Sequence, residues 1–230
     1  FQSELMTAGD GVDVYVTQAV VRLGAGLDGD RLRWAAEQLL VSHRVLRSAF
    51  VTAPSGAAVA VVADDVILPW SVVDIGDVDD ERRAAAVDRI VAGQRIEPFD
   101  LAVAPLMRFV LMRHGDSATL LATSHHILLD GWSGPLVMAD LLALYTDGRT
   151  YTGRIATKTG DFADYLAYVG VRDHADAMAA WARVLAPIEG PTLVAAGTEA
   201  TESSLPRDLE VMLDTDTTAA LQSVARARGA

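Results

Sequence analysis

The chain has 230 residues, of which 51% are hydrophobic and 22% charged, so its composition is globular and its length allows one or two domains. A formal net charge of −12 without a basic block argues against nucleic acid as a partner. The chain has no cysteine, which excludes disulfides and thiolate chemistry. No apolar run approaches the ~18 residues of a membrane span and no signal peptide opens the sequence, so we expect a cytoplasmic protein.

The first half of the chain is predicted to alternate strands and helices. Apolar alternation predicts a strand over residues 12–23, with Val12, Val14 and Val16 on one face. Asp30 is the predicted N-cap of the helix that follows. The further elements are a helix over 31–43, strands over 46–51 and 57–62 joined by a turn at 54–56, and a helix that starts with the acidic residues 77–81 and runs to about 96.

The second half begins with a predicted β-hairpin that turns at Gly115 and Asp116. Its strands cover residues 106–112 and 117–124, and helices are predicted over 135–145, 161–169, 175–185 and 217–228, with a strand over 209–213. Residues 190–206 are rich in Thr, Ser, Gly and Ala and are interpreted as a linker. Alternating strands and helices with a hairpin indicate an α/β sandwich with a mixed sheet.

Two consecutive histidines, His125 and His126, follow the second strand of the hairpin. Successive strand residues point to opposite faces, so the pair is a poor chelate for one metal ion, and no third ligand lies at a usual spacing. The sequence after Gly131 lacks the second glycine of a nucleophile elbow, and Ser133 fits a plain helix N-cap. One imidazole acting as general base remains, with Asp130 fixing the loop or orienting a partner.

Four stretches together resemble the condensation domains of nonribosomal peptide synthetases, which belong to the chloramphenicol acetyltransferase superfamily. HHILLDG at residues 125–131 matches their HHxxxDG motif, and the next residues give the ending DGWS. SHRVLRSAF at residues 42–50 resembles RHExLRTxF. PFDL at 98–101 and PLMR at 105–108 are similar to the segment PFDLxxxPLxR.

The resemblance implies a chloramphenicol acetyltransferase-like αβ sandwich that forms one lobe of a V-shaped, two-lobed domain with a substrate tunnel between the lobes. Residues 1–189 would be the N-terminal lobe, 190–206 the crossover linker and 207–230 the start of the C-terminal lobe. An isolated lobe is expected to be inactive and to present its active site as a shallow, partly apolar groove open on one side.

The resemblance also assigns roles to residues of the motif. His126 would be the working histidine, which orients or deprotonates the acceptor amine or stabilises the tetrahedral intermediate, and His125 would be a structural one. Asp130 would form an architectural ion pair with an arginine, for which Arg47 is the candidate, although a simple turn or N-cap role stays open. Gly131 would supply a backbone conformation or a close approach that a side chain would block.

Other positions carry weaker implications. Trp132 and Ser133 are possible residues of the substrate channel, with a core position as the alternative for Trp132. His43 keeps its place in the motif, but Arg44 stands where the family has glutamate, which puts any role of that glutamate in doubt. His114 and His174 are predicted to lie on the surface.

The implied reaction is acyl transfer between two carrier-bound thioesters, in which an acceptor amine attacks a donor carbonyl and forms a peptide bond. The partners would be donor and acceptor peptidyl carrier protein domains and adjacent synthetase modules, and these carriers would bring the phosphopantetheine arms. No directly bound cofactor and no metal are expected. The first three residues, Phe1-Gln2-Ser3, and the stretch 126–133 look most like the subtype that accepts a D-configured donor.

Two alternatives belong to other functional classes. An epimerisation domain shares HHxxxDG but typically continues with Val-Ser-Trp-Arg, whereas this chain continues Trp132-Ser133-Gly134-Pro135. An inactive, condensation-like recruitment domain tends to lose the second histidine or the glycine, and both are present here. A heterocyclisation domain is disfavoured because it replaces the histidines with aspartates.

Overall fold

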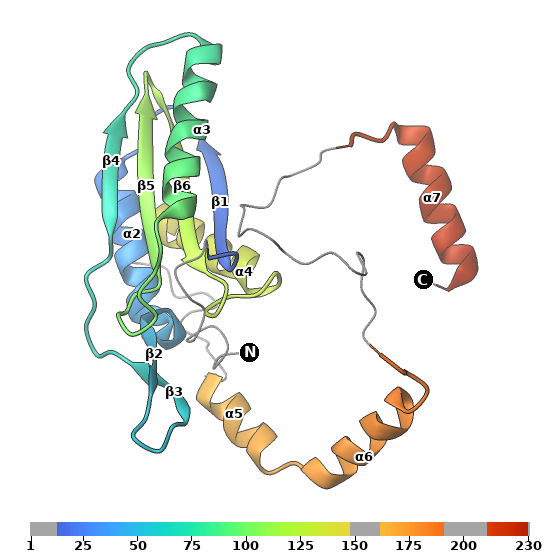
Figure 1. The fold of residues 1–230 in the computed structure, drawn as a ribbon. Helices are drawn as coiled ribbons and strands as arrows, with labels where there is room; N and C mark the ends of the chain where they lie inside the picture. The colour runs from blue at the N-terminus through green and yellow to red at the C-terminus, as the bar shows by residue number, and fades with distance from the viewer. Residues whose placement is uncertain (1–12, 148–161, 191–210, 230) are drawn as a thin grey trace. The chain divides into compact units, whose positions relative to one another are not determined.

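The computed structural model describes residues 13–147, 162–190 and 211–229 (Figure 1). The chain divides into two units, residues 1–200 and 201–230. The regular elements of the first unit are β1 (Val16–Leu23), α2 (Gly29–Ser42), the 3₁₀ helix η1 (Arg44–Arg47), β2 (Ser48–Thr52), β3 (Ala58–Val62), β4 (Trp70–Asp74), α3 (Asp80–Ile96), β5 (Met107–His114), β6 (Ser117–His125), α4 (Ser133–Asp147), α5 (Phe162–Gly170) and α6 (His174–Leu185).

The main sheet of the first unit has the strand order β1-β6-β5-β4. Strand β6 runs antiparallel to both β1 and β5, and β4 lies parallel to β5, so the sheet is mixed as the sequence predicts. Strand β4 was not predicted from the sequence; it is a short edge strand that begins directly after Pro69. A parallel neighbour needs a long crossover, and α3 provides it between β4 and β5.

Helices cover both faces of this sheet (Figure 1). Phe109, Leu111 and Leu120 pack in a core with residues of α2 and α4. Val110, Met112 and Leu121 point the other way and pack against the apolar residues of α3. Alternate residues of β5 and β6 are buried on opposite faces, so both strands are buried along most of their length.

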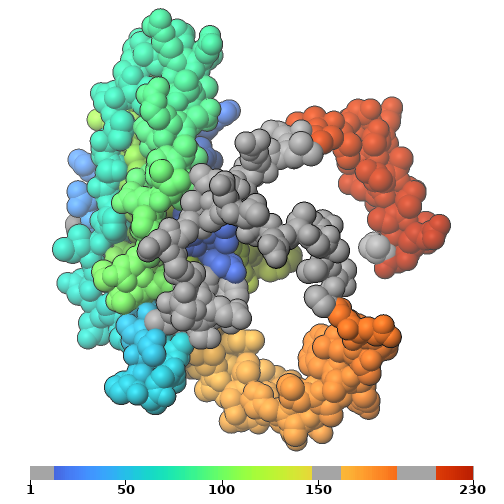
Figure 2. Space-filling model, in the orientation of Figure 1, coloured from blue at the N-terminus to red at the C-terminus, as the bar shows by residue number. Residues whose placement is uncertain are grey.

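Helix α3 is an outer layer rather than part of the core. None of its residues is fully buried, and its side chains form much of the surface in Figure 2, where they are green. Asp79 caps the helix by accepting a hydrogen bond from the Arg82 N–H over 2.8 Å. Asp80 and Glu81 occupy its first turn, where negative charge is favourable, so the predicted acidic helix start is confirmed.

Several boundaries differ from the predictions. Helix α2 begins at Gly29, and its N-cap is Asp28, which accepts from the Arg31 N–H; Asp30 lies in the first turn instead. The strand predicted from residue 12 begins at Val16, since its pairing with β6 starts opposite His125. The strand predicted from residue 46 begins two residues later, because η1 follows α2 directly.

The predicted turns are confirmed. Gly115 has φ +55° at the turn between β5 and β6, and Gly56 has φ +82° at the turn between β2 and β3. Both values lie in the left-handed region, which glycine enters without the steric cost of a Cβ. Strands β2 and β3 form a separate antiparallel pair.

The second unit contains one described helix, α7 (Thr215–Arg228), which Asp214 caps. Helices α5, α6 and α7 confirm the three helices predicted after residue 160. Residues 211–214 form no strand, so the prediction over 209–213 is wrong for its described part; no neighbouring strand pairs with it there. The linker predicted over 190–206 lies almost wholly outside the described residues, and the predicted lobe boundaries stay predictions. No helix among the described residues is long and apolar enough to cross a membrane.

Candidate functional site

The two histidines of the motif have opposite environments. Strand β6 ends at His125, whose side chain is only 1% exposed, whereas His126 is exposed. The alternation of the strand explains this difference, because consecutive side chains leave opposite faces. His125 points to the α3 side of the sheet together with Thr123, and His126 leaves on the side of α2 and α4.

The His125 ring is fixed at both nitrogen atoms. Its Nδ1 accepts a hydrogen bond from the Ile127 N–H over 3.0 Å, so the ring proton lies on Nε2, which is 3.1 Å from Oδ2 of Asp13. Burial lowers the pKa of His125, and the Asp13 carboxylate partly opposes this effect. A neutral ring locked in one tautomer is a structural element, which agrees with the role predicted for His125.

The two proline-containing motifs meet at this same ring. Phe99 approaches His125 edge-on, with ring centroids 6.5 Å apart and an interplanar angle of 88°. The guanidinium of Arg108 lies 4.1 Å from the Phe99 ring centroid and donates to the main-chain carbonyls of Gln94 and Glu97. Burial lowers the pKa of Arg108, opposed by Glu97. These contacts connect the end of α3 to His125 through Phe99.

His126 follows the end of β6, and Tyr15, the residue before β1, holds its main chain. Its N–H donates to the carbonyl of Tyr15 over 2.7 Å. Within the described residues its ring makes no side-chain hydrogen bond or ion pair, so both of its nitrogen atoms remain available for exchange of a proton with a substrate.

The His126 ring borders a groove of about 370 Å³ between the sheet and α4. Most of the lining is apolar and comes from β1, α2, β5, β6 and α4; the lining residues are Thr17, Gln18, Ala19, Leu39, Met107, Phe109, Ala122, Ser124, His126, Leu129, Asp130, Gly131, Gly134, Pro135, Val137, Met138 and Leu141. An imidazole at the edge of an apolar groove agrees with the shallow, partly apolar site expected of a single lobe.

Asp130 fixes the turn between His126 and α4. Its Oδ1 accepts from the main-chain N–H of Trp132 and from both the N–H and the hydroxyl of Ser133, at 2.7–3.1 Å. The hydrogen bonds from Ser133 lower the pKa of the Asp130 carboxyl. Asp130, not Ser133, therefore accepts the first N–H groups of α4, and the turn alternative for Asp130 is favoured.

The predicted ion pair between Asp130 and Arg47 is wrong. The Arg47 guanidinium donates to three main-chain carbonyls, those of Leu40 and Val41 at the end of α2 and that of Ala63 after β3, each at 3.0 Å. Arg47 thus satisfies carbonyls that the helix end leaves open, and it supports the lobe at a different place from the HHxxxDG turn.

The role predicted for Gly131 is also wrong in this structure. Its φ is not positive, and a Cβ built on it would meet no atom within 4 Å. The core alternative for Trp132 is wrong as well, since the residue is 87% exposed. Neither Trp132 nor Ser133 lines the groove, and their contact with a substrate stays a prediction.

Two pairs of side chains that the sequence did not predict also support the site. Asp13 pairs with His125, and nothing in the sequence pattern around residue 13 marks it. Asp140 is buried on α4 and lies 3.1 Å from His43 Nε2. A single acidic residue within the apolar pattern of residues 135–145 was the signal that could have identified Asp140.

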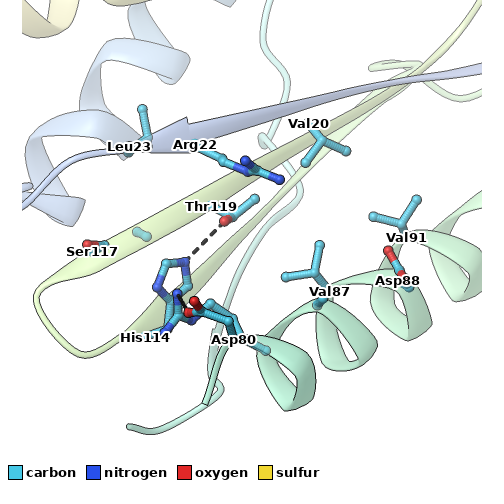
Figure 3. A pocket seen from close by; sticks show the side chains of 13 residues that line it. Val20, Arg22, Leu23, Asp80, Val87, Asp88, Val91, His114, Ser117 and Thr119 are labelled. Atoms are coloured by element: carbon cyan, nitrogen blue, oxygen red, sulfur yellow. Dashed lines mark hydrogen bonds and ion pairs between the residues drawn. The ribbon is translucent and has the colours of Figure 1, made fainter. Parts of the chain in front are cut away.

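A larger cavity of about 620 Å³ lies at the opposite ends of β1 and β6, on the face covered by α3 (Figure 3). Two pairs of its polar groups contact each other: Arg83 pairs with Asp80 at 2.9 Å, and His114 Nε2 lies 3.1 Å from the Thr119 hydroxyl. Nε of Arg83 is buried without a hydrogen-bond partner among the described residues. His114 is half-buried rather than the surface residue predicted, whereas His174 is exposed as predicted. Both motif histidines lie elsewhere, so volume alone does not identify the site.

Comparison with known proteins agrees with the motif. The family model described as "Condensation domain" matches residues 5–230. Chondramide synthase cmdD from Chondromyces crocatus is 31% identical over 218 residues, which cover 94% of this chain and 6% of the synthase. Phosphinothricin tripeptide synthetase PhsC from Streptomyces viridochromogenes is 36% identical over 160 residues, 67% of this chain and 15% of the synthetase. The chain therefore spans only a small part of the length of these relatives.

Solved structures share the fold. The SgcC5 protein from Streptomyces globisporus matches with a TM-score of 0.58 and 28% identity, over 65% of this chain and 35% of that one. The cyclization-docking bidomain of EpoB from Sorangium cellulosum matches with a TM-score of 0.74 and 20% identity, over 96% and 45%. The predicted α/β fold with a mixed sheet is confirmed.

Proposed function

The chain belongs to the condensation-domain family of nonribosomal peptide synthetases, and we propose that it supplies the histidine that acts in amide-bond formation between two carrier-bound substrates. One observation carries this proposal. His126 is exposed beside an apolar groove and has no side-chain partner within the described residues, whereas the adjacent His125 is buried and bonded at both nitrogen atoms. Only one of the two rings is therefore suited to exchange a proton with a substrate.

In the proposed reaction the neutral amine of the acceptor attacks the carbonyl carbon of the donor thioester. The new C–N bond forms, the amine nitrogen gives its proton to the His126 imidazole, and a tetrahedral intermediate results. The intermediate collapses when the C–S bond breaks, and the departing thiolate takes the proton back from the imidazolium. The products are an amide on the acceptor and a free thiol on the donor carrier, with the histidine regenerated.

In this proposal, the apolar groove favours acyl transfer over hydrolysis. Apolar side chains such as Met107, Ala122 and Val137 line the groove that the ring borders and disfavour water there. Phosphopantetheine arms from a donor and an acceptor carrier domain would meet at His126, which converts a bimolecular step into an effectively unimolecular one. A second lobe would supply the opposite wall, so this chain by itself is expected to be inactive.

The same proposal extends to Trp132, the partners, the configuration of the donor and the location of the protein. Trp132 is exposed one residue beyond Gly131 of the groove, where its indole could contact an incoming arm. Adjacent synthetase modules are the proposed partners, a D-configured residue is the proposed donor, and the cytoplasm is the proposed location.

The test is a reconstituted assay with the complete domain that contains this chain and with loaded donor and acceptor carriers. Dipeptidyl-carrier formation is followed by mass spectrometry, and the configuration of the product is determined. The His126→Ala domain is expected to lose about 10²–10⁴-fold in rate, whereas the matched control His174→Ala, at an exposed histidine of α6, keeps the wild-type rate.

The other outcomes identify other functions. An inverted donor residue without a new amide bond would indicate an epimerisation domain. A folded wild-type domain that gives no product with any loaded pair would indicate a recruitment domain. Near-normal turnover of His126→Ala would overturn the assignment of this histidine.

A further inference from the structure

Asp13, just before β1, makes two hydrogen bonds that converge on the HHxxxDG turn. Its Oδ1 accepts from the Tyr15 N–H over 2.8 Å, and its Oδ2 is 3.1 Å from Nε2 of His125. A single carboxylate therefore fixes both the start of β1 and the buried ring that precedes His126. No motif in the sequence includes this residue.

Asp13 restrains the main chain around His126 in two ways, one through Tyr15 and one through His125. In one branch, Tyr15 accepts the His126 main-chain N–H over 2.7 Å. In the other, His125 Nδ1 accepts the Ile127 N–H over 3.0 Å. The N–H of His126 and the N–H of the next residue are thus both held by groups that Asp13 itself binds, which restrains the backbone from which the His126 side chain leaves.

The His125 tautomer depends on the same carboxylate. Nδ1 must stay deprotonated to accept the Ile127 N–H, so Nε2 carries the proton and needs an acceptor inside the fold. Asp13 is that acceptor, and its side chain is three-quarters buried. Without Asp13, the buried Nε2–H of His125 would lose its acceptor. The proton could then move to Nδ1, which in that tautomer cannot accept the Ile127 N–H.

We propose that Asp13 is a positioning residue: through Tyr15 and His125 it places the His126 ring at the edge of the groove. Asp13 does not line the groove, so it acts through other residues and not on the substrate. The proposal rests on the proposed function of His126. It adds that the start of β1 is part of the machinery of the site.

The test compares three variants. Asp13→Ala removes both hydrogen bonds, and Asp13→Asn keeps a carbonyl oxygen for one of them. Asp74→Ala is the matched control, because Asp74 Oδ1 accepts the N–H two residues later over the same 2.8 Å but contacts no histidine. Kinetics are measured in the complete domain with loaded carriers, and NMR is recorded on this chain.

Asp13→Ala is expected to lower kcat on the order of 10²-fold with little change in KM, because a displacement of about 1 Å costs that much and no substrate contact is lost. The exchange-protected Nε2–H resonance of His125 should disappear in Asp13→Ala, persist in Asp74→Ala, and return with a part of kcat in Asp13→Asn. Should Asp13→Ala not fold, Asp13→Asn still reports on both the resonance and kcat.

Wild-type kcat in Asp13→Ala, or a His125 resonance that persists there, would overturn the proposal. Equal losses of kcat in Asp13→Ala and Asp74→Ala would overturn it too, since they would reflect general stability. The NMR readout does not need activity. A wild-type domain without turnover would therefore count against the proposed function, while the resonance would still decide whether Asp13 fixes His125.

Discussion

His43 Nε2 lies 3.1 Å from Oδ2 of Asp140, and this contact joins the end of α2 to the middle of α4. The Asp140 side chain is only 4% exposed, so the carboxylate is held where water cannot replace the histidine. Helix α4 forms one wall of the groove at His126. The pair therefore links His43, in the stretch at residues 42–50, to the groove beside the HHxxxDG motif.

Replacement of Asp140 by alanine should lower the free energy of unfolding by about 1–3 kcal/mol, because it removes the hydrogen bond between a buried carboxylate and His43. Urea unfolding of the chain measures this loss. The control Asp65→Ala, at an exposed aspartate, should stay within about 0.5 kcal/mol of the wild type. An Asp140→Ala chain as stable as the wild type would show that the contact contributes nothing.

The two motif histidines should respond to alanine substitution in opposite ways. His125→Ala removes a buried ring and leaves the Ile127 N–H without its acceptor, so the unfolding free energy should fall by about 1–3 kcal/mol or more. His126→Ala alters an exposed side chain and should change stability by no more than about 0.5 kcal/mol. Thermal and urea unfolding of both variants check this, and an equally large loss of stability in His126→Ala would contradict it.

Asp130 and Arg47 should act independently, because they share no hydrogen-bond partner. Asp130→Ala is expected to speed hydrogen exchange at the Ser133 and Gly134 amides by freeing the start of α4. Arg47→Ala should act at the end of α2 instead. A double-mutant cycle on unfolding free energy should be additive, and a coupling energy outside the experimental error would restore the ion-pair interpretation.

The sequence predicted the parts of this fold that local chemistry determines. Turn glycines, the acidic start of α3 and the apolar run before His125 are all local signals, and the hairpin and most helices were found from such signals. Strand β4 was missed because a five-residue edge strand carries little pattern of its own, and only its parallel pairing with β5 makes it regular. The N-cap of α2 was predicted at Asp30 instead of Asp28, because two aspartates flank Gly29 and the sequence alone does not say which one accepts the hydrogen bond.

The site was predicted as far as its motif extends. The different faces of His125 and His126 follow from strand alternation alone. The partners of His125 do not, since Asp13 and Phe99 reach it from segments that are far from each other in sequence. The Arg47 pairing failed for the same reason: a matched motif indicates neighbouring segments, but three carbonyls at the end of α2 and after β3 compete for the guanidinium.

Acidification should destabilise the chain through His125. Burial lowers the pKa of this ring below its ordinary value of 6.5, and the neighbouring charge of His126 acts in the same direction, while Asp13 opposes both. The folded chain therefore takes up this proton less readily than the unfolded chain does. Above pH 6.5 both states are neutral at this position, and its contribution to stability is fully present.

As the pH falls from 6.5 toward the lowered folded pKa, the unfolded state is protonated first, and the unfolding free energy decreases by at most about 1.4 kcal/mol per pH unit for this one proton. Urea unfolding between about pH 7.5 and 5 measures the slope. In the His125→Gln variant the slope of the unfolding free energy against pH should be smaller, because the titrating ring is gone. The variant will be less stable than the wild type at neutral pH. His174→Gln changes an exposed histidine and should leave the slope as it is. If His125→Gln and the wild type lose stability in parallel as the pH falls, the acid sensitivity belongs to the carboxylates and not to the buried histidine of the motif.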